Sequence, residues 1–121
     1  MPDEYRFLVF STAESADALS AYARAIRRQL PQGRVLVAEP VGEKTINGRL
    51  TVDDGSGTPA IVPFSAAEVL EALVAYCIDR SIPLPRVSEK TLERLHGRFA
   101  LRIGHVDSME WQMRSHAPRE R

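Results

Sequence analysis

Two copies of a Ser-x-x-Glu motif determine where this chain can begin a helix. One pairs Ser11 with Glu14 and the other pairs Ser65 with Glu68. In such a capping box the serine side chain accepts from the N–H three residues on, and the glutamate reaches back to the serine N–H. Apolar residues then recur at helical spacing: Ala16, Leu19, Tyr22, Ala23, Ile26 and Leu30 after the first motif, and Ala66, Val69, Leu70, Leu73, Val74, Cys77 and Ile78 after the second. The sequence therefore predicts two helices, the first extending to Pro31 and the second ending before Pro83.

Short runs rich in branched and aromatic residues surround these helices and predict strands. They cover residues 5–10, 34–38, 49–52, 60–62, 91–95 and 98–103. Asn47-Gly48 and His96-Gly97 are typical of tight hairpin turns. The order is β-α-β-β-β-α-β-β, so we expect an α+β fold, a two-layer sandwich with two helices packed on one mainly antiparallel sheet. A ferredoxin-like plait is the first topology to expect, and a fold of this kind carries no function by itself.

Length and composition favour an ordinary globular domain. The chain has 121 residues, of which 44% are hydrophobic and 26% are charged. We expect one domain over residues 1–114 and a flexible C-terminal tail over residues 115–121. The single cysteine, Cys77, rules out an intramolecular disulfide, and no apolar stretch resembles a signal peptide or a membrane span. The expected location is therefore the cytoplasm, with no membrane partner.

The charges are balanced overall but unevenly distributed. Residues 1–79 carry 7 basic and 11 acidic side chains, and residues 80–121 carry 9 and 5, for a net charge of zero. This asymmetry is compatible with an anionic partner, and equally with neutralisation of one half by the other or with head-to-tail contact between subunits. The isoelectric point of 6.8 lies well below the value of about 9 that is usual for a nucleic-acid domain, so nucleic acid is an unlikely partner.

A loop with the sequence TVDDGSGTP, residues 51–59, resembles a cation or phosphate site but lacks its key groups. Counting from Asp53, alternate positions fall on Gly55 and Gly57, and the twelfth position is Phe64, where a calcium loop needs glutamate. No Gly-Lys-Ser/Thr end leads into a helix. We therefore expect a turn, with Asp53 and Asp54 accepting from turn amides. The histidines show no metal-ligand spacing, so neither a metal nor a cofactor is expected.

Two groups of residues remain as candidate sites. His105 and Asp107 form the nearest approach to an acid–base pair, although no nucleophile motif accompanies them. Arg98 and Arg102 lie on one face of a predicted hairpin and Arg94 joins them in one register, so these arginines form a candidate anion surface.

The absence of catalytic and metal-binding spacings favours a small non-catalytic, self-associating protein-interaction or regulatory module, with a homodimer as the expected form. Two alternatives remain open. One is a small ligand-binding domain or enzyme with a pocket near His105, Asp107 and the hairpin arginines. The other is an anion- or RNA-binding surface on the same hairpin.

Overall fold

The computed structural model describes residues 5–84 and 89–104, which form two helices and six strands. In chain order these are β1 (Tyr5–Val9), α1 (Thr12–Ala25), β2 (Arg34–Val41), β3 (Asn47–Asp53), β4 (Ala60–Phe64), α2 (Ala66–Asp79), β5 (Glu89–Leu95) and β6 (Arg98–Gly104). The α+β class and the predicted order of elements are confirmed. Neither helix in this part of the chain is long and apolar enough to cross a membrane.

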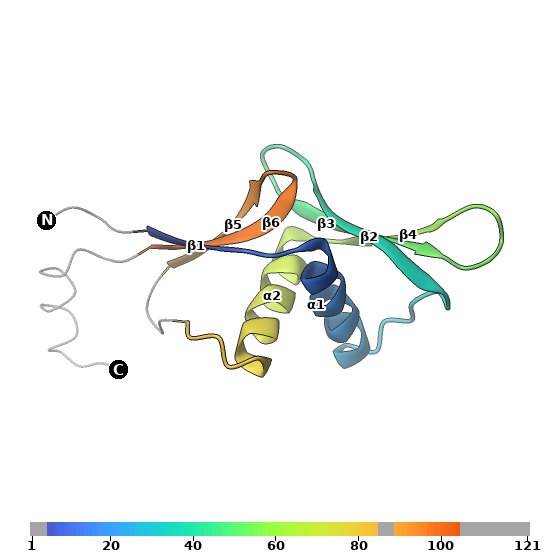
Figure 1. Cartoon of the computed structure of the whole chain (residues 1–121), viewed down its shortest axis with the longest axis horizontal. Coiled ribbons are helices and arrows are strands. Elements are labelled where there is room, and N and C mark those ends of the chain that lie inside the picture. Colours follow the sequence, from blue (N-terminus) through green and yellow to red (C-terminus); the bar gives the residue numbers. More distant parts are fainter. Residues whose placement is uncertain (1–4, 85–88, 105–121) are drawn as a thin grey trace, which may run out of the picture.

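The strands form two antiparallel three-stranded sheets, where the sequence predicted one sheet. Their strand orders are β1-β6-β5 and β2-β3-β4. A ferredoxin-like plait does not describe this pairing, because that plait is a single four-stranded sheet, whereas the six strands here divide into two sheets of three. Both helices lie side by side on the same side of the two sheets (Figure 1), where α1 packs on α2 and β2.

Helix α1 is shorter than its apolar pattern predicted. Both capping boxes form as expected, but α1 ends at Ala25 and does not extend to Pro31. Arg27 adopts a left-handed conformation with φ 60°, and the N–H of Arg28 donates to the carbonyl of Ala23 at 2.8 Å. This is a Schellman motif, and α2 ends in the same arrangement. Arg28 consequently lies outside the helix, and its side chain is available for contacts with the other half of the chain.

The core lies between the helices and the inner faces of the sheets. It is built from Phe10, Ala18, Leu19, Ala23, Ala38, Leu50, Val62, Phe64, Val69, Ala72, Leu73, Cys77, Phe99 and Leu101. Most of these residues lie on the apolar patterns that the sequence predicted. The His96-Gly97 turn is also confirmed, with φ 54° and 74°, as a two-residue hairpin requires.

Asn47 and Gly48 begin strand β3, whereas the sequence predicted a hairpin turn there. The Asn47 side chain accepts from the N–H of Ala66 at 3.0 Å and so ties β3 to the start of α2. Gly48 lies so close to its neighbours that a Cβ atom would be 2.7 Å from Val69 Cγ2 and 3.3 Å from Phe99 Cζ. Glycine is needed here for close packing, not for a turn.

The chain contains a repeat that relates its two halves. Residues 10–22 align with residues 64–76 at an offset of 54, and eight of the thirteen aligned positions are identical. The shared pattern is Phe-Ser-x-Ala-Glu-x-x-x-Ala-Leu-x-Ala-Tyr. The secondary structure repeats with the sequence, because β1-α1-β2-β3 and β4-α2-β5-β6 are both βαββ units. The described part of the chain therefore consists of two βαββ halves.

The strand registers show that the two halves are related by an approximate two-fold axis. The first strand of each half pairs with the last strand of the other, β1 with β6 and β4 with β3. The pairs Arg6–Ile103 and Ala60–Val52 occupy equivalent positions. Residues at equivalent positions of the two halves are also in direct contact. Arg94 is equivalent to Pro40, which lies 54 residues earlier in the chain, and its guanidinium donates to the carbonyl of Pro40 at 3.1 Å. Contact between equivalent residues is expected where a two-fold axis passes through a structure.

Replacing Gly48 with alanine is expected to destabilise the protein by about 1–3 kcal/mol, because the added methyl group overpacks the junction of β3, β6 and α2. Chemical denaturation monitored by far-UV circular dichroism measures the change. Thr51→Ala, on the outer face of the same strand, is the control and is expected to have a smaller effect. Equal stability of Gly48→Ala and the natural protein would contradict the close packing described above.

Candidate functional site

The sequence candidates do not assemble into one site within the described residues. His105 and Asp107 lie outside them. The register of β5 and β6 places Arg98 and Arg102 on the outer face of their sheet, whereas Arg94 lies on the opposite face and donates to the carbonyl of Pro40. Arg102 has an anionic neighbour already, since its Nε lies 3.6 Å from a carboxylate oxygen of Glu93. The three arginines therefore form no common cluster.

The DDGSGTP segment, residues 53–59 of the loop discussed above, forms a turn between β3 and β4. The carboxylate of Asp53 accepts from the N–H of Gly55 at 3.1 Å, and that of Asp54 accepts from the N–H of Ser56 at 3.0 Å. The bonds from Ser56 also hold the pKa of the Asp54 carboxyl below its ordinary value. Among residues 5–84 and 89–104, no three His, Cys, Asp or Glu side chains gather as a metal site requires.

The edge of strand β1 exposes backbone hydrogen-bonding groups. The N–H of Phe10 donates to the carbonyl of Phe99 at 2.9 Å, which makes Phe10 and Phe99 a hydrogen-bonded pair of the β1–β6 ladder. Such pairs alternate along an antiparallel ladder. The N–H and C=O groups of Tyr5, Phe7 and Val9 therefore point away from β6, toward the edge of the sheet.

The same three residues expose apolar side chains on the outer face of the sheet. The exposed fractions are 54% for Tyr5, 48% for Phe7 and 37% for Val9. The Arg102 guanidinium lies over the Tyr5 ring, with Cζ 5.2 Å from the ring centroid. Helices cover the inner face of the sheet, and no described element covers this side (Figure 1). We call Tyr5, Phe7 and Val9 the β1 strip. An alternating apolar row on an edge strand is typical of a surface that pairs with another chain.

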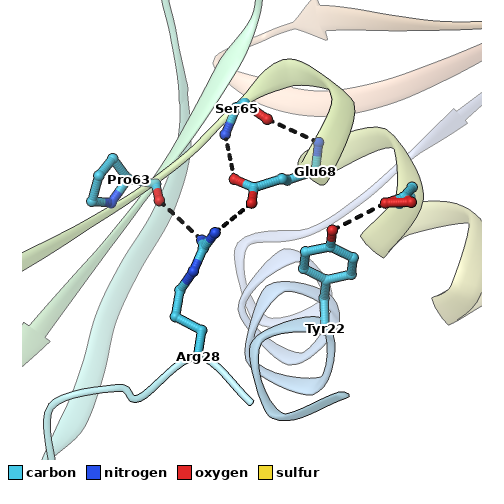
Figure 2. Close-up of polar contacts among 6 residues, drawn as sticks. Tyr22, Arg28, Pro63, Ser65 and Glu68 are labelled. Carbon is cyan, nitrogen blue, oxygen red and sulfur yellow. Dashed lines mark hydrogen bonds and ion pairs between the residues drawn. The ribbon is translucent and has the colours of Figure 1, made fainter. Parts of the chain in front are cut away.

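The edge of strand β4, which is equivalent to β1, is blocked by Arg28. The guanidinium of Arg28 donates to the carbonyl of Pro63 at 3.3 Å and forms an ion pair with Glu68 (Figure 2). The same guanidinium lies 5.0 Å from the centroid of the Phe64 ring. Arg28 belongs to the first half of the chain and its partners to the second, so the contact also fastens the two halves together.

Glu68 connects this ion pair to the capping box of α2. One of its carboxylate oxygens accepts from the N–H of Ser65 at 2.9 Å, and the other faces Arg28 (Figure 2). The pKa of the Glu68 carboxyl is lowered from its ordinary value of 4.5, first by the Ser65 N–H and then by the Arg28 guanidinium. A lowered pKa in the folded state means that the charged form stabilises the fold above that value. This stabilisation is lost as the pH falls through the folded-state pKa.

A second apolar surface lies along α2, beside Tyr22 of α1. It is an open groove of about 470 Å³ lined by Tyr22, Leu70, Glu71, Val74, Ala75 and Ile78. The Tyr22 hydroxyl donates to the Glu71 carboxylate at 3.0 Å (Figure 2), and burial together with this carboxylate raises the pKa of Tyr22. At the positions of Leu70, Val74 and Ile78, α1 carries Ala16, Ser20 and Arg24. The apolar residues of the groove are therefore not repeated on α1, and its polar lining consists of the bonded pair Tyr22 and Glu71.

Comparison with known proteins identifies no relative of this chain. No protein-family model, curated protein or solved structure matches it. The geometry of the described residues is therefore the basis for any proposal about its function.

Replacing Arg28 with methionine is expected to lower the free energy of unfolding by about 1 kcal/mol at pH 7, because the ion pair is only partly buried. The difference from the natural protein should shrink as the pH falls below 4.5 and Glu68 becomes protonated. Urea denaturation at a series of pH values measures it. Arg34→Met, at an exposed position, is the control, and a difference that persists unchanged into acid would contradict the role of the Glu68 charge.

Proposed function

We propose that this protein is a non-catalytic interaction module that associates with itself, with the homodimer as its working form. The observation that carries the proposal is the β1 strip, in which three apolar side chains alternate along an edge strand whose outward backbone groups have no partner among the described residues. Burying these side chains removes apolar area from water, which is the main driving force of association. The proposed association involves no cofactor, and the proposed location is the cytoplasm.

The amount of exposed apolar surface supports this reading. Within residues 5–84 and 89–104, seven large apolar side chains are exposed by more than a third. Five of these belong to strands, namely Tyr5, Phe7, Val9, Leu36 and Ile61. Single exposed apolar residues are common, but a row of neighbours on one strand marks an interaction surface. The charge asymmetry between the two ends of the chain is compatible with such association.

The alternatives have weaker support among the described residues. A ligand-binding or enzymatic site near His105 and Asp107 finds no concave partner in the hairpin, because Arg98 and Arg102 lie on the outer face of the sheet and not in the groove on α2. An anion- or RNA-binding surface would need cations without competing carboxylates, and Arg102 faces Glu93. In the part of the chain that the structure describes, the exposed aromatic rings are those of Tyr5 and Phe7, which the interaction proposal already uses.

Sedimentation velocity or light scattering between about 1 and about 100 µM, a range that detects micromolar dissociation constants, tests the proposal. The expected result is a species with twice the monomer mass of 13.5 kDa. Phe7→Glu should shift the equilibrium strongly toward monomer, because it places a charge in the apolar interface.

Ile61→Glu provides a matched control, because Ile61 takes the place of Phe7 in the second half and is exposed to a similar degree, 54% against 48%. It should leave the dimer intact. A natural protein that remains monomeric across the whole range would overturn the proposal. A dimer that resists Phe7→Glu would show that the β1 strip does not carry it.

A further inference from the structure

The two halves of the chain allow their sheet edges to be compared position by position. Strands β1 and β4 are equivalent, and each is the edge of its sheet beside the last strand of the other half. An offset of 54 aligns Val9 with Pro63 and Phe10 with Phe64. The backbone groups of Val9 and Pro63 therefore both point outward, so any difference between the two edges comes from the residues and not from their place in the fold.

The β4 edge is closed at the position where β1 stays open. Pro63 has no N–H to donate, and its carbonyl already accepts from Arg28 (Figure 2). In β1 the equivalent Val9 retains its N–H. The residue equivalent to Arg28 is Ile82, whose apolar side chain cannot donate to the Val9 carbonyl. With respect to the described residues, both the donor and the acceptor at Val9 are therefore available to another strand.

The other two edges carry further features that discourage pairing. In β2 these are Pro40 and a bulge in the ladder between Val35 and Val37. In β5 they are the charged residues Glu89, Lys90, Glu93 and Arg94. Proline, bulges and charges are the usual means by which edge strands avoid unwanted pairing. Of the four edges in the described part of the chain, β1 is the one with alternating apolar side chains and none of these blocks at its outward positions.

We infer that two copies of the chain join by antiparallel pairing of β1 with β1, centred on Phe7, to form a continuous six-stranded sheet. This inference rests on the proposed self-association and names its geometry. A second copy is the occupant because the strip is complementary to itself: an antiparallel pair centred on Phe7 sets Phe7 against Phe7 and Tyr5 against Val9. Pairs of aromatic residues, and of aromatic with branched residues, are among the favourable cross-strand pairs.

The backbone geometry fits the same register. The outward N–H and C=O groups belong to Tyr5, Phe7 and Val9, which are the residues that face one another in this arrangement. Each facing pair exchanges two hydrogen bonds, so the three pairs supply about six bonds across the interface. A shift of one residue would set the outward groups of one copy against residues whose groups point inward to β6. The register centred on Phe7 therefore satisfies every outward group of the strip.

Disulfide cross-linking tests this register directly. Facing residues in a hydrogen-bonded antiparallel pair have Cα atoms about 5.5 Å apart, which a disulfide can span. Phe7→Cys should therefore give a covalent dimer under mild oxidation by copper phenanthroline. Tyr5→Cys should give little, because the two copies of Tyr5 lie about 13 Å apart, four residues along the strand. The natural protein, whose Cys77 is buried, serves as the blank.

Val9→Pro tests the open edge by giving β1 the residue that closes β4. The fold should tolerate it, because the Val9 N–H makes no bond within the sheet and β4 accommodates Pro63 at the same place. The dimer should lose bonds on both sides of its two-fold axis, raising the dissociation constant about tenfold or more. Val9→Thr keeps the N–H and should retain the dimer.

The outcomes separate the inference from the proposal on which it rests. A monomeric natural protein overturns both. A stable dimer that cross-links through Tyr5→Cys as readily as through Phe7→Cys, or that Val9→Pro leaves unchanged with its circular dichroism spectrum intact, overturns the inference alone. Cross-linking of Phe7→Cys in preference to Tyr5→Cys supports the register even if Val9→Pro does not fold.

Discussion

The reciprocal exchange of strands between the two halves is the constraint on which the structure depends. Neither βαββ half completes a sheet by itself, because β1 hydrogen-bonds to β6 and β4 hydrogen-bonds to β3. The two helices pack against each other beneath this exchange and bury the inner faces of both sheets. Arg28 adds a polar fastening across the same junction through Glu68 and Pro63. Unfolding of one half therefore exposes the core of the other, which favours a single cooperative unit.

Local signals in the sequence were sufficient to predict the order of the helices and strands, but not all of their ends and not their assembly. The capping boxes located the start of both helices because they depend on contacts within four residues, and His96-Gly97 located a hairpin for the same reason. The end of α1 was missed because Arg27 takes a left-handed conformation that usually marks glycine. Asn47-Gly48 was mistaken for a turn because the space at Gly48 is taken by Val69 and Phe99, which are distant in sequence.

The division into two sheets and the location of the strip required knowledge of long-range pairing. The sequence placed Arg94, Arg98 and Arg102 on one hairpin, but only the register separates Arg94 from the other two. Strand β1 is proposed as the dimer contact because it lies at the edge of its sheet, and the residues of β1 alone do not show this position. The repeat was a signal that was present in the sequence, since Phe-Ser-x-Ala-Glu occurs twice with similar spacing of the residues that follow. Comparison of the halves by offset would have predicted the equivalence of β1 and β4.

The pairing of β1 with β6 also has a consequence for the synthesis of the chain. Of the eight described elements, a ribosome completes β1 first and β6 last, so Tyr5 has no partner strand until Gly104 is synthesised. Until then an aromatic strand with unpaired backbone on both sides is exposed in the cell, which is a state prone to aggregation. The long separation of these strands in the sequence also slows folding, because the chain loses loop-closure entropy before the contacts between β1 and β6 can stabilise it. The nascent chain is therefore prone to aggregate at β1, the strand through which the folded protein is proposed to form its dimer.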